Sequence, residues 1–241
     1  MAEGKLLQAN GYDEITAHAF GTVLADSFAS TLVKFGFQND KARAVTPTVE
    51  AVISGTSDMY SLMNIRVDTV TLSCPYNLAA SLASQVHSLV ADTYYYVLTA
   101  VNSLGQTGPS LEVSTIVTTP SLAPKLTWNA LTGALSYKIF RSTISGAYTN
   151  TLVTTIATYG TVQYTDIGSA TNNDSPPIIN TTAGTSPGYA TAPSTITGFA
   201  SSLELASVQI GEQRFFWVGI NAGSGISEAD NPRQCILRIS E

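Results

Sequence analysis

The residue types that most often carry out catalysis are few in this chain. Nucleophilic catalysis needs a serine, threonine or cysteine held against a base such as histidine, yet the 241 residues contain only two histidines, His18 and His87. The GxSxG, HExxH, P-loop and dinucleotide-binding motifs are absent from the sequence. We therefore expect both histidines to serve at the surface or in a partner contact, and we expect no catalytic residues.

Acidic side chains are the second source of chemistry, since paired carboxylates can hydrolyse a glycosidic bond or hold Ca²⁺. The turn at 226–232 lacks the repeated acidic ligands of a calcium loop, and the glycine-rich run 219–227 is typical of a hairpin loop rather than of a phosphate-binding loop. We expect no metal and no cofactor. The acidic candidates are Asp166, Asp174, Glu228 and Asp230.

Tyrosines offer a third kind of site, because exposed aromatic rings can form a platform for sugars. Tyr148, Tyr159 and Tyr189 are the candidates. In a β-rich protein such tyrosines more often pack at strand ends or cover the core, and that interpretation is favoured here.

The charge balance excludes several partner classes. A net charge of −6 and a pI near 4.8 argue against nucleic-acid binding, which depends on clustered Lys and Arg. No apolar run approaches the length of a membrane span, and the first residues lack the apolar core of a secretion signal. Cys74 and Cys235 have no metal-ligand spacing, and buried free thiols are favoured over a disulfide.

The composition predicts an all-β fold. The chain is 44% hydrophobic but only 12% charged, and it is rich in Thr, Ser and Tyr. Alternating apolar residues predict strands at 48–53 and 65–70, whereas a four-residue spacing of apolar side chains within 15–32 favours a short helix.

The clearest strand patterns lie between 93 and 168. TYYYVLTAV (93–101) and SLEVSTIVT (110–118) flank a turn rich in glycine, which predicts a hairpin. Further alternating runs follow at short intervals with turn residues between them. Such spacing is typical of a β-sandwich. These runs are KLTWNAL (125–131), ALSYKIFRST (134–143), TLVTTIAT (151–158) and VQYTDIG (162–168).

The segment 169–195 differs from its surroundings, because it is rich in Pro, Asn, Thr and Gly and almost free of charge. A loop of this length is unusual inside a compact domain, so we expect a linker, or an arm that orders on contact with a neighbour. The β pattern then resumes. Phe215 and Trp217 share one face of a strand and Phe216 the other, and we expect this strand to serve in assembly.

Residues 93–168 resemble fibronectin type III-like modules. TYYYVLTAVNSLGQTGPS (93–110) is similar to the final hairpin of that family, LTWNALTGALSYKIFRSTISGAY (126–148) to its middle strands, and VQYTDIG to the strand that closes that half. The amino-acid sequence of the hairpin also resembles that of modules found within virion proteins of tailed bacteriophages. The resemblance implies a module core made of Tyr94, Tyr96, Trp128, Tyr137 and Tyr164.

The order of these motifs departs from that of the family. In the family the half of the module that contains the core tryptophan (the tryptophan half) usually precedes the hairpin, whereas here the hairpin comes first. Two truncated modules in tandem or one circularly permuted module would explain this order, and the permuted module is favoured because its length suits one domain. NLAASLAS (77–84) would supply its opening strand. We expect the module at 73–168 to be inserted into a discontinuous β-rich assembly domain formed by 1–72 and 196–241.

The insertion carries a further expectation. Strand 65–73 would pair with 213–220 or with the C-terminal strand, and Cys74 would then lie near Cys235. The two sulfur atoms would lie within about 15 Å of each other in the folded chain, a distance of about four Cα–Cα steps.

Three functions follow from this interpretation. The favoured one is a structural protein of a tailed-phage virion (a head decoration, neck or tail-fibre-associated protein) that assembles with other virion proteins and copies of itself and touches host surface glycan weakly and many times. The alternatives are a carbohydrate-binding or adhesion module of a bacterial surface protein, and a hydrolase with two carboxylates in a cleft.

Overall fold

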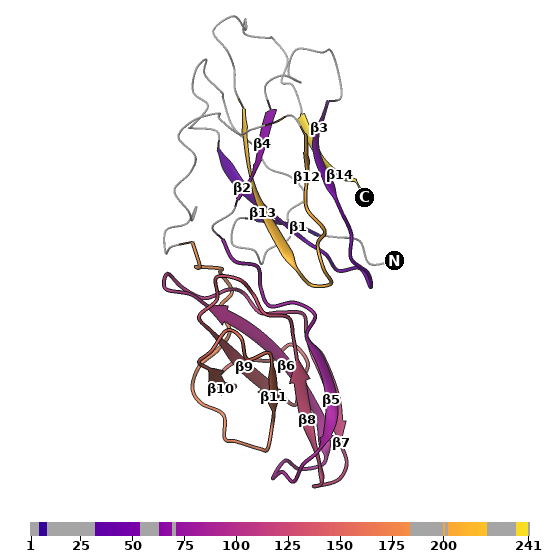
Figure 1. Cartoon of the computed structure of the whole chain (residues 1–241), viewed down its shortest axis with the longest axis vertical. Helices are drawn as coiled ribbons and strands as arrows, with labels where there is room; N and C mark the ends of the chain where they lie inside the picture. The colour runs from indigo at the N-terminus through magenta and orange to yellow at the C-terminus, as the bar shows by residue number, and fades with distance from the viewer. Residues whose placement is uncertain are drawn as a thin grey trace, which may run out of the picture. The chain divides into compact units, whose positions relative to one another are not determined.

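The chain is an all-β protein built from antiparallel sheets (Figure 1). The structure, a computed structural model, describes residues 5–8, 32–53, 63–68, 71–183, 200, 202–220 and 235–240, and these residues contain no helix. The all-β prediction is confirmed. Contacts divide the chain into two compact units: unit 1 comprises Met1–Thr71, Ser186–Gln209 and Gln213–Glu241, and unit 2 comprises Leu72–Thr185 and Ile210–Glu212.

Unit 1 contains two antiparallel sheets among its described residues. The first sheet has the order β1-β2-β13-β4 and the second has the order β12-β3-β14. The strands are β1 (Lys5–Gln8), β2 (Val33–Gln38), β3 (Thr48–Ile53), β4 (Met63–Val67), β12 (Ser202–Glu204), β13 (Gln213–Ile220) and β14 (Cys235–Ser240).

The core of unit 1 forms where β2 and β13 run side by side. Phe35 on β2 is the register partner of Phe216 on β13, and their rings stack with centroids 6.1 Å apart. Val45, Val49, Ile65, Leu205, Val208 and Val218 are buried in the same cluster with Phe37. Because alternate side chains of a strand point to opposite faces, Lys34, Phe215 and Trp217 lie on the other face, and they too are buried.

Unit 2 also contains two sheets, with the orders β10-β9-β6-β7 and β11-β8-β5 (Figure 1). The longest strand, β6, pairs with β7 on one side and with β9 on the other. The strands are β5 (Ala79–Ser84), β6 (Asp92–Val101), β7 (Val113–Val117), β8 (Leu122–Thr127), β9 (Ser136–Ser142), β10 (Leu152–Ile156) and β11 (Gln163–Thr165).

One hydrophobic cluster joins the two sheets of unit 2. Tyr96 and Leu98 from β6 pack in it with Leu126 from β8, and Trp128 meets Tyr137 edge to face with ring centroids 5.5 Å apart. Edge-to-face contact suits the quadrupoles of two aromatic rings and adds about 0.5–1.5 kcal/mol beyond their burial. Aromatic residues thus hold the two sheets together.

Residues 169–183, the first half of the expected linker or arm, lie on unit 2. The backbone N–H of Asn172 donates to the carbonyl of Leu152, and Lys138 forms an ion pair with Asp174. The buried Asn180 donates to the carbonyl of Leu72 at 2.8 Å. Polar side chains rather than an apolar pattern anchor this stretch, and 184–195 lie outside the described residues.

Other expectations meet mixed outcomes. The pairing of strand 65–73 with strand 213–220 is confirmed by β4 and β13, in which Arg66 is the register partner of Trp217. Strands β1 and β2 were not expected. The expected helix at 15–32 falls outside the described residues except for Leu32. The spacing of the two sulfur atoms stays a prediction, because the side chain of Cys235 lies outside the described set.

Candidate functional site

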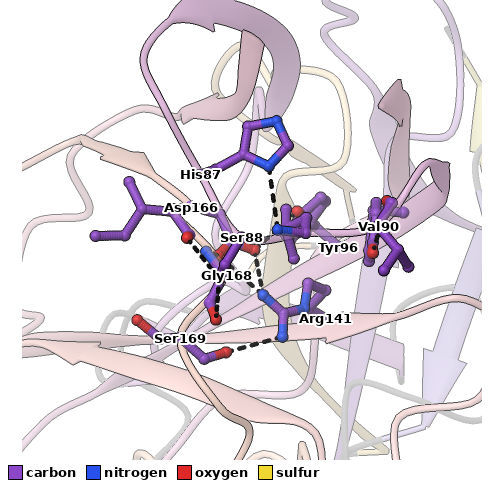
Figure 2. Close-up of polar contacts among 11 residues, drawn as sticks. His87, Ser88, Val90, Tyr96, Arg141, Asp166, Gly168 and Ser169 are labelled. Carbon is purple, nitrogen blue, oxygen red and sulfur yellow. Dashed lines mark hydrogen bonds and ion pairs between the residues drawn. The ribbon is translucent and has the colours of Figure 1, made fainter. Parts of the chain in front are cut away.

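The most extensive buried polar network lies in unit 2 around Asp166, and we refer to Tyr96, Arg141, Asp166, Gly168 and Ser169 as the Asp166 site (Figure 2). Arg141, on β9, donates from Nη1 to both carboxylate oxygens of Asp166 at 2.8 and 2.9 Å. Tyr96, on β6, donates its hydroxyl to Oδ2 at 2.9 Å. The site therefore links two neighbouring strands to the segment after β11.

The backbone after β11 completes this network. The N–H of Gly168 donates to Oδ1 of Asp166 at 2.9 Å, and Nη2 of Arg141 donates to the carbonyl of Ser169 at 2.9 Å. Figure 2 shows Arg141 reaching between Asp166 and Ser169. Gly168 has a φ of 93°, and a Cβ there would clash with Ser88. A glycine is thus required for the chain to close around the carboxylate.

Burial and charge make the Asp166 site chemically inert. Asp166 is fully buried, and burial together with the Asp166 carboxylate raises the pKa of Tyr96 far above its ordinary value. Each carboxylate oxygen already accepts two hydrogen bonds, so neither has a free lone pair for a substrate proton. A buried carboxylate whose oxygens all accept hydrogen bonds within the protein has a structural role.

A second buried network, the Lys34 cluster, lies in unit 1 and comprises Lys34, Asp68, Thr71, Phe215 and Trp217. Lys34 Nζ donates to Oδ2 of Asp68 at 2.9 Å and to Oγ1 of Thr71 at 2.6 Å. The Thr71 hydroxyl donates to the same Oδ2 at 2.6 Å. Nζ also lies 5.4 Å from the ring centroid of Trp217 and 5.8 Å from that of Phe215.

The Lys34 side chain has no exposed surface, and that of Asp68 is 2% exposed. Burial lowers the pKa of Lys34, and the neighbouring Asp68 carboxylate opposes this effect only in part. Burial, which disfavours the charged form, thus brings the amine closer to its neutral form than a surface lysine. The cluster thus holds an amine and a carboxylate 2.9 Å apart and out of contact with solvent.

A third network is exposed and centres on Glu112, in the segment before β7. Its carboxylate accepts from the hydroxyls of Ser145 and Tyr148, both at 2.6 Å, and from the N–H of Gly146 at 2.8 Å. Burial alone would raise the pKa of Glu112, but the three donors outweigh it and hold the pKa below its ordinary value. This carboxylate fastens the turn after β9 to the start of β7.

The residues of the expected module core lie together in unit 2. Tyr94, Tyr96, Trp128 and Tyr137 are buried in one cluster, and Tyr164 packs against it while remaining partly exposed. Tyr94 also lies beneath the Arg141 guanidinium, with Cζ 5.8 Å from its ring centroid. The same tyrosines thus support both the core and the Asp166 site.

The strand expected to serve in assembly lies inside a sheet and not at its edge. Phe215, Phe216 and Trp217 lie on β13, which is hydrogen-bonded to β2 on one side and to β4 on the other. All three side chains are at most 5% exposed. A central strand with buried side chains offers neither a free edge nor an apolar face to a partner.

The remaining candidates are dispersed. His87 is buried, contrary to the surface position expected: its Nε2 lies 2.9 Å from the carbonyl of Thr119, and its Nδ1 accepts from the N–H of Leu89. Tyr148 bonds to Glu112, and Tyr159 is 53% exposed. The sulfur of Cys74 is buried and donates to the carbonyl of Gly211. His18, Tyr189, Glu228 and Asp230 lie outside the described residues.

Sequence reasoning missed Lys34, Arg141 and Glu112 as members of polar networks. For Lys34 a signal existed, because it stands inside the apolar run VKFGFQ, where a lysine either faces water or needs a buried partner. Arg141 and Glu112 find their partners 25 to 36 residues away, and no local pattern reveals such pairs.

Comparison with protein-family models, with curated proteins and with solved structures finds no match to this chain. Within the described ranges no group of three or more His, Cys, Asp or Glu side chains is placed to hold a metal ion. Across those same ranges no helix is long and apolar enough to cross a membrane.

Proposed function

We propose that this protein is a structural component of a tailed-phage virion, and that it acts by packing against other subunits rather than by catalysis. The observation that carries the proposal is a pair of uncharged strand edges in unit 2, on β5 and β7. Each strand has one hydrogen-bonded neighbour among the described residues. The sequences AASLAS and VSTIV contain no charge and no proline.

These edges are unusual for a soluble monomer. Natural edge strands are commonly protected by lysine, proline, a bulge or a covering loop, because an open edge invites pairing with another chain. Here β5 and β7 lie beside each other, and both carry exposed apolar side chains: Leu82 is 40% and Ile116 61% exposed. Val86 and Val90, between β5 and β6, are 77% and 70% exposed. We call Leu82, Val86, Val90 and Ile116 the β5/β7 edge.

Such a surface suits a partner subunit. Burying apolar surface stabilises a contact by about 25 cal/mol per Å² before the costs of association, and strand addition supplies main-chain hydrogen bonds at the same time. A virion repeats one contact many times, so each copy needs only modest affinity. Edges of this kind would be unfavourable in an enzyme that diffuses freely as a monomer, because they invite pairing with other chains.

The finer fold assignment belongs to this proposal. We assign unit 2 as a circularly permuted fibronectin type III-like sandwich inserted into the domain formed by unit 1. Support comes from β6, which pairs both with its hairpin partner β7 and with β9 of the tryptophan half. Two truncated modules in tandem would each hold a separate core, whereas Tyr96 and Trp128 share one cluster.

The proposal is tested by the oligomeric state of the full chain in solution. Multi-angle light scattering over a range of concentrations should show association that Ile116→Lys and Leu82→Lys weaken, because a buried lysine opposes packing. Leu135→Lys is the matched control, since Leu135 is 58% exposed but lies outside the β5/β7 edge. A chain that stays monomeric at all concentrations and binds glycans would contradict the assembly role.

The virion location has its own test. Mass spectrometry of purified particles of the phage that encodes this chain should detect it in a fixed ratio to the major structural proteins. Its absence from intact particles would overturn the location while leaving the assembly result unaffected.

A further inference from the structure

We infer that Lys34 and Asp68 form an intramolecular isopeptide bond, which joins strand β2 covalently to the end of strand β4. The inference rests on the arrangement of the Lys34 cluster and stands independently of the proposed function. The amine and the carboxylate are 2.9 Å apart and out of contact with solvent. The register holds them there, because Lys34 pairs with Trp217 and Trp217 pairs with Arg66, two residues before Asp68.

Geometry supplies the first requirement of the reaction. Amide formation needs the amine nitrogen to approach the carboxyl carbon, and the hydrogen bond from Nζ to Oδ2 holds the two groups in contact. Well-oriented intramolecular groups react as though present at about 10⁵–10⁸ M. The folded backbone fixes both partners, so little further ordering is needed.

The surroundings supply the second requirement, a neutral amine. The side chains of Lys34 and Asp68 are 0% and 2% exposed, and the neighbouring rings of Phe215 and Trp217 are buried as well. Removal from water penalises an ammonium and a carboxylate alike. Transfer of one proton along the hydrogen bond converts the ion pair into an amine and a carboxylic acid, which carry no charge to desolvate.

The bond-forming step balances without any further reactant. The neutral Nζ of Lys34 attacks Cγ of Asp68, a C–N bond forms, and the C–O bond to the carboxyl hydroxyl breaks. The hydroxyl leaves as water and takes one proton from the attacking nitrogen. Thr71 is placed to relay that proton, because its hydroxyl accepts from Nζ and donates to Oδ2, each at 2.6 Å.

Two other ion pairs in the described residues show what the Lys34 cluster adds. Arg141 and Asp166 are 2.8 Å apart with side chains 12% and 0% exposed, but a guanidinium does not lose its proton in a protein. Lys138 and Asp174 are 2.7 Å apart, but their side chains are 26% and 38% exposed, so this pair is open to solvent. Only the pair formed by Lys34 and Asp68 combines a lysine, a carboxylate and full burial within these described pairs.

The test is the intact mass of the purified, folded full chain. The mass should be lower than the sequence mass by one water molecule, and trypsin should fail to cut after Lys34. Tandem mass spectrometry should find peptides 6–41 and 67–125 joined as one branched species. A succinimide would also remove water, but it would leave Lys34 cleavable, and finding it would overturn the inference.

Variants and a folding control complete the test. Lys34→Arg should restore the full sequence mass, whereas Lys138→Arg should retain the loss of water. Wild-type chain that has never folded, isolated from insoluble material in denaturant, should have its full mass and should lose water only after it is folded. Because the wild-type mass alone decides the matter, a variant that fails to fold leaves the test intact: a folded wild type of unchanged mass would refute the crosslink.

Discussion

Tyr96 donates its hydroxyl hydrogen to Oδ2 of Asp166 across 2.9 Å, and neither residue has any exposed surface. Tyr96 belongs to the aromatic core between the sheets of unit 2, whereas Asp166 belongs to the segment after β11. The hydrogen bond therefore connects the core to the polar network that closes one end of the unit.

Replacement of Asp166 should be among the most destabilising changes in unit 2. Asp166→Asn keeps the shape but leaves the Arg141 guanidinium, which is 12% exposed, without its counter-charge. Loss of one partner of a buried pair costs about 3–5 kcal/mol, whereas Tyr96→Phe removes one bond to a charged group and should cost about 1.5–3 kcal/mol. Urea unfolding measures both values.

Asp174→Asn is the control for that series. It breaks the exposed pair with Lys138, and exposed pairs contribute about 0–1 kcal/mol. If Asp166→Asn cost no more than this control, the structural role assigned to the Asp166 site would be wrong.

The Glu112 network should make stability depend on pH in the acid range. Its folded pKa lies below the ordinary value of 4.5, so its contribution is present above that value and is lost as the pH falls through the folded pKa. Glu112→Gln should therefore lower the melting temperature at neutral pH and have a smaller effect at about pH 3. Thermal unfolding followed by circular dichroism at both pH values measures the difference.

Tyr148→Phe tests the cause of that dependence. It removes one of the three donors to Glu112, so the difference between the two pH values should shrink but persist. An acid dependence that is the same in wild type and in both variants would show that other carboxylates carry it.

The sequence predicted the strands of unit 2 well. In TYYYVLTAV the buried Tyr94 and Tyr96 stand on either side of the partly exposed Tyr95, as the alternation predicts, whereas every side chain from Tyr96 to Ala100 is buried. The sequence failed to predict β2. There Lys34 and Gly36 interrupt the apolar pattern of VKFGFQ, and the lysine is buried by partners more than thirty residues away. Local periodicity reports which face is apolar, but it does not report a buried charge that a distant residue compensates.

The polar networks were less predictable than the strands. The sequence offers Asp166 as a candidate for a pair of carboxylates, yet its partners in the structure are Arg141 and Tyr96. The pairing follows from the order of strands in the sheet, in which β6 and β9 are neighbours. Strand order is a tertiary property, and the residue spacing along the chain does not encode it directly.

Gly105 should tolerate no side chain. An added Cβ would lie 2.5 Å from the carbonyl oxygen of Thr181, and backbone cannot move aside as a flexible side chain can. Gly105→Ala should cost about 1–3 kcal/mol, the range for overpacking. Gly108→Ala is the matched control in the same turn, since a Cβ there meets nothing within 4 Å. Equal stability of the two variants in urea would show that residues 181–183 are not held against this turn.

Asn180 should control how firmly residues 169–183 are held on unit 2. Its Nδ2 donates to the carbonyl of Leu72, its Oδ1 accepts from the hydroxyl of Thr182 at 2.7 Å, and that hydroxyl accepts from the N–H of Leu72 at 3.0 Å. Asn180→Ala leaves buried polar groups unsatisfied, at a cost of about 1–3 kcal/mol. Thermolysin should then cleave near Ile178 and Ile179 faster than in wild type, while Asn172→Ala, at an exposed position of the same segment, should leave the rate unchanged. Unaltered cleavage in the Asn180 variant would mean that the backbone bonds of Asn172 and Thr181, rather than this side chain, hold the segment in place.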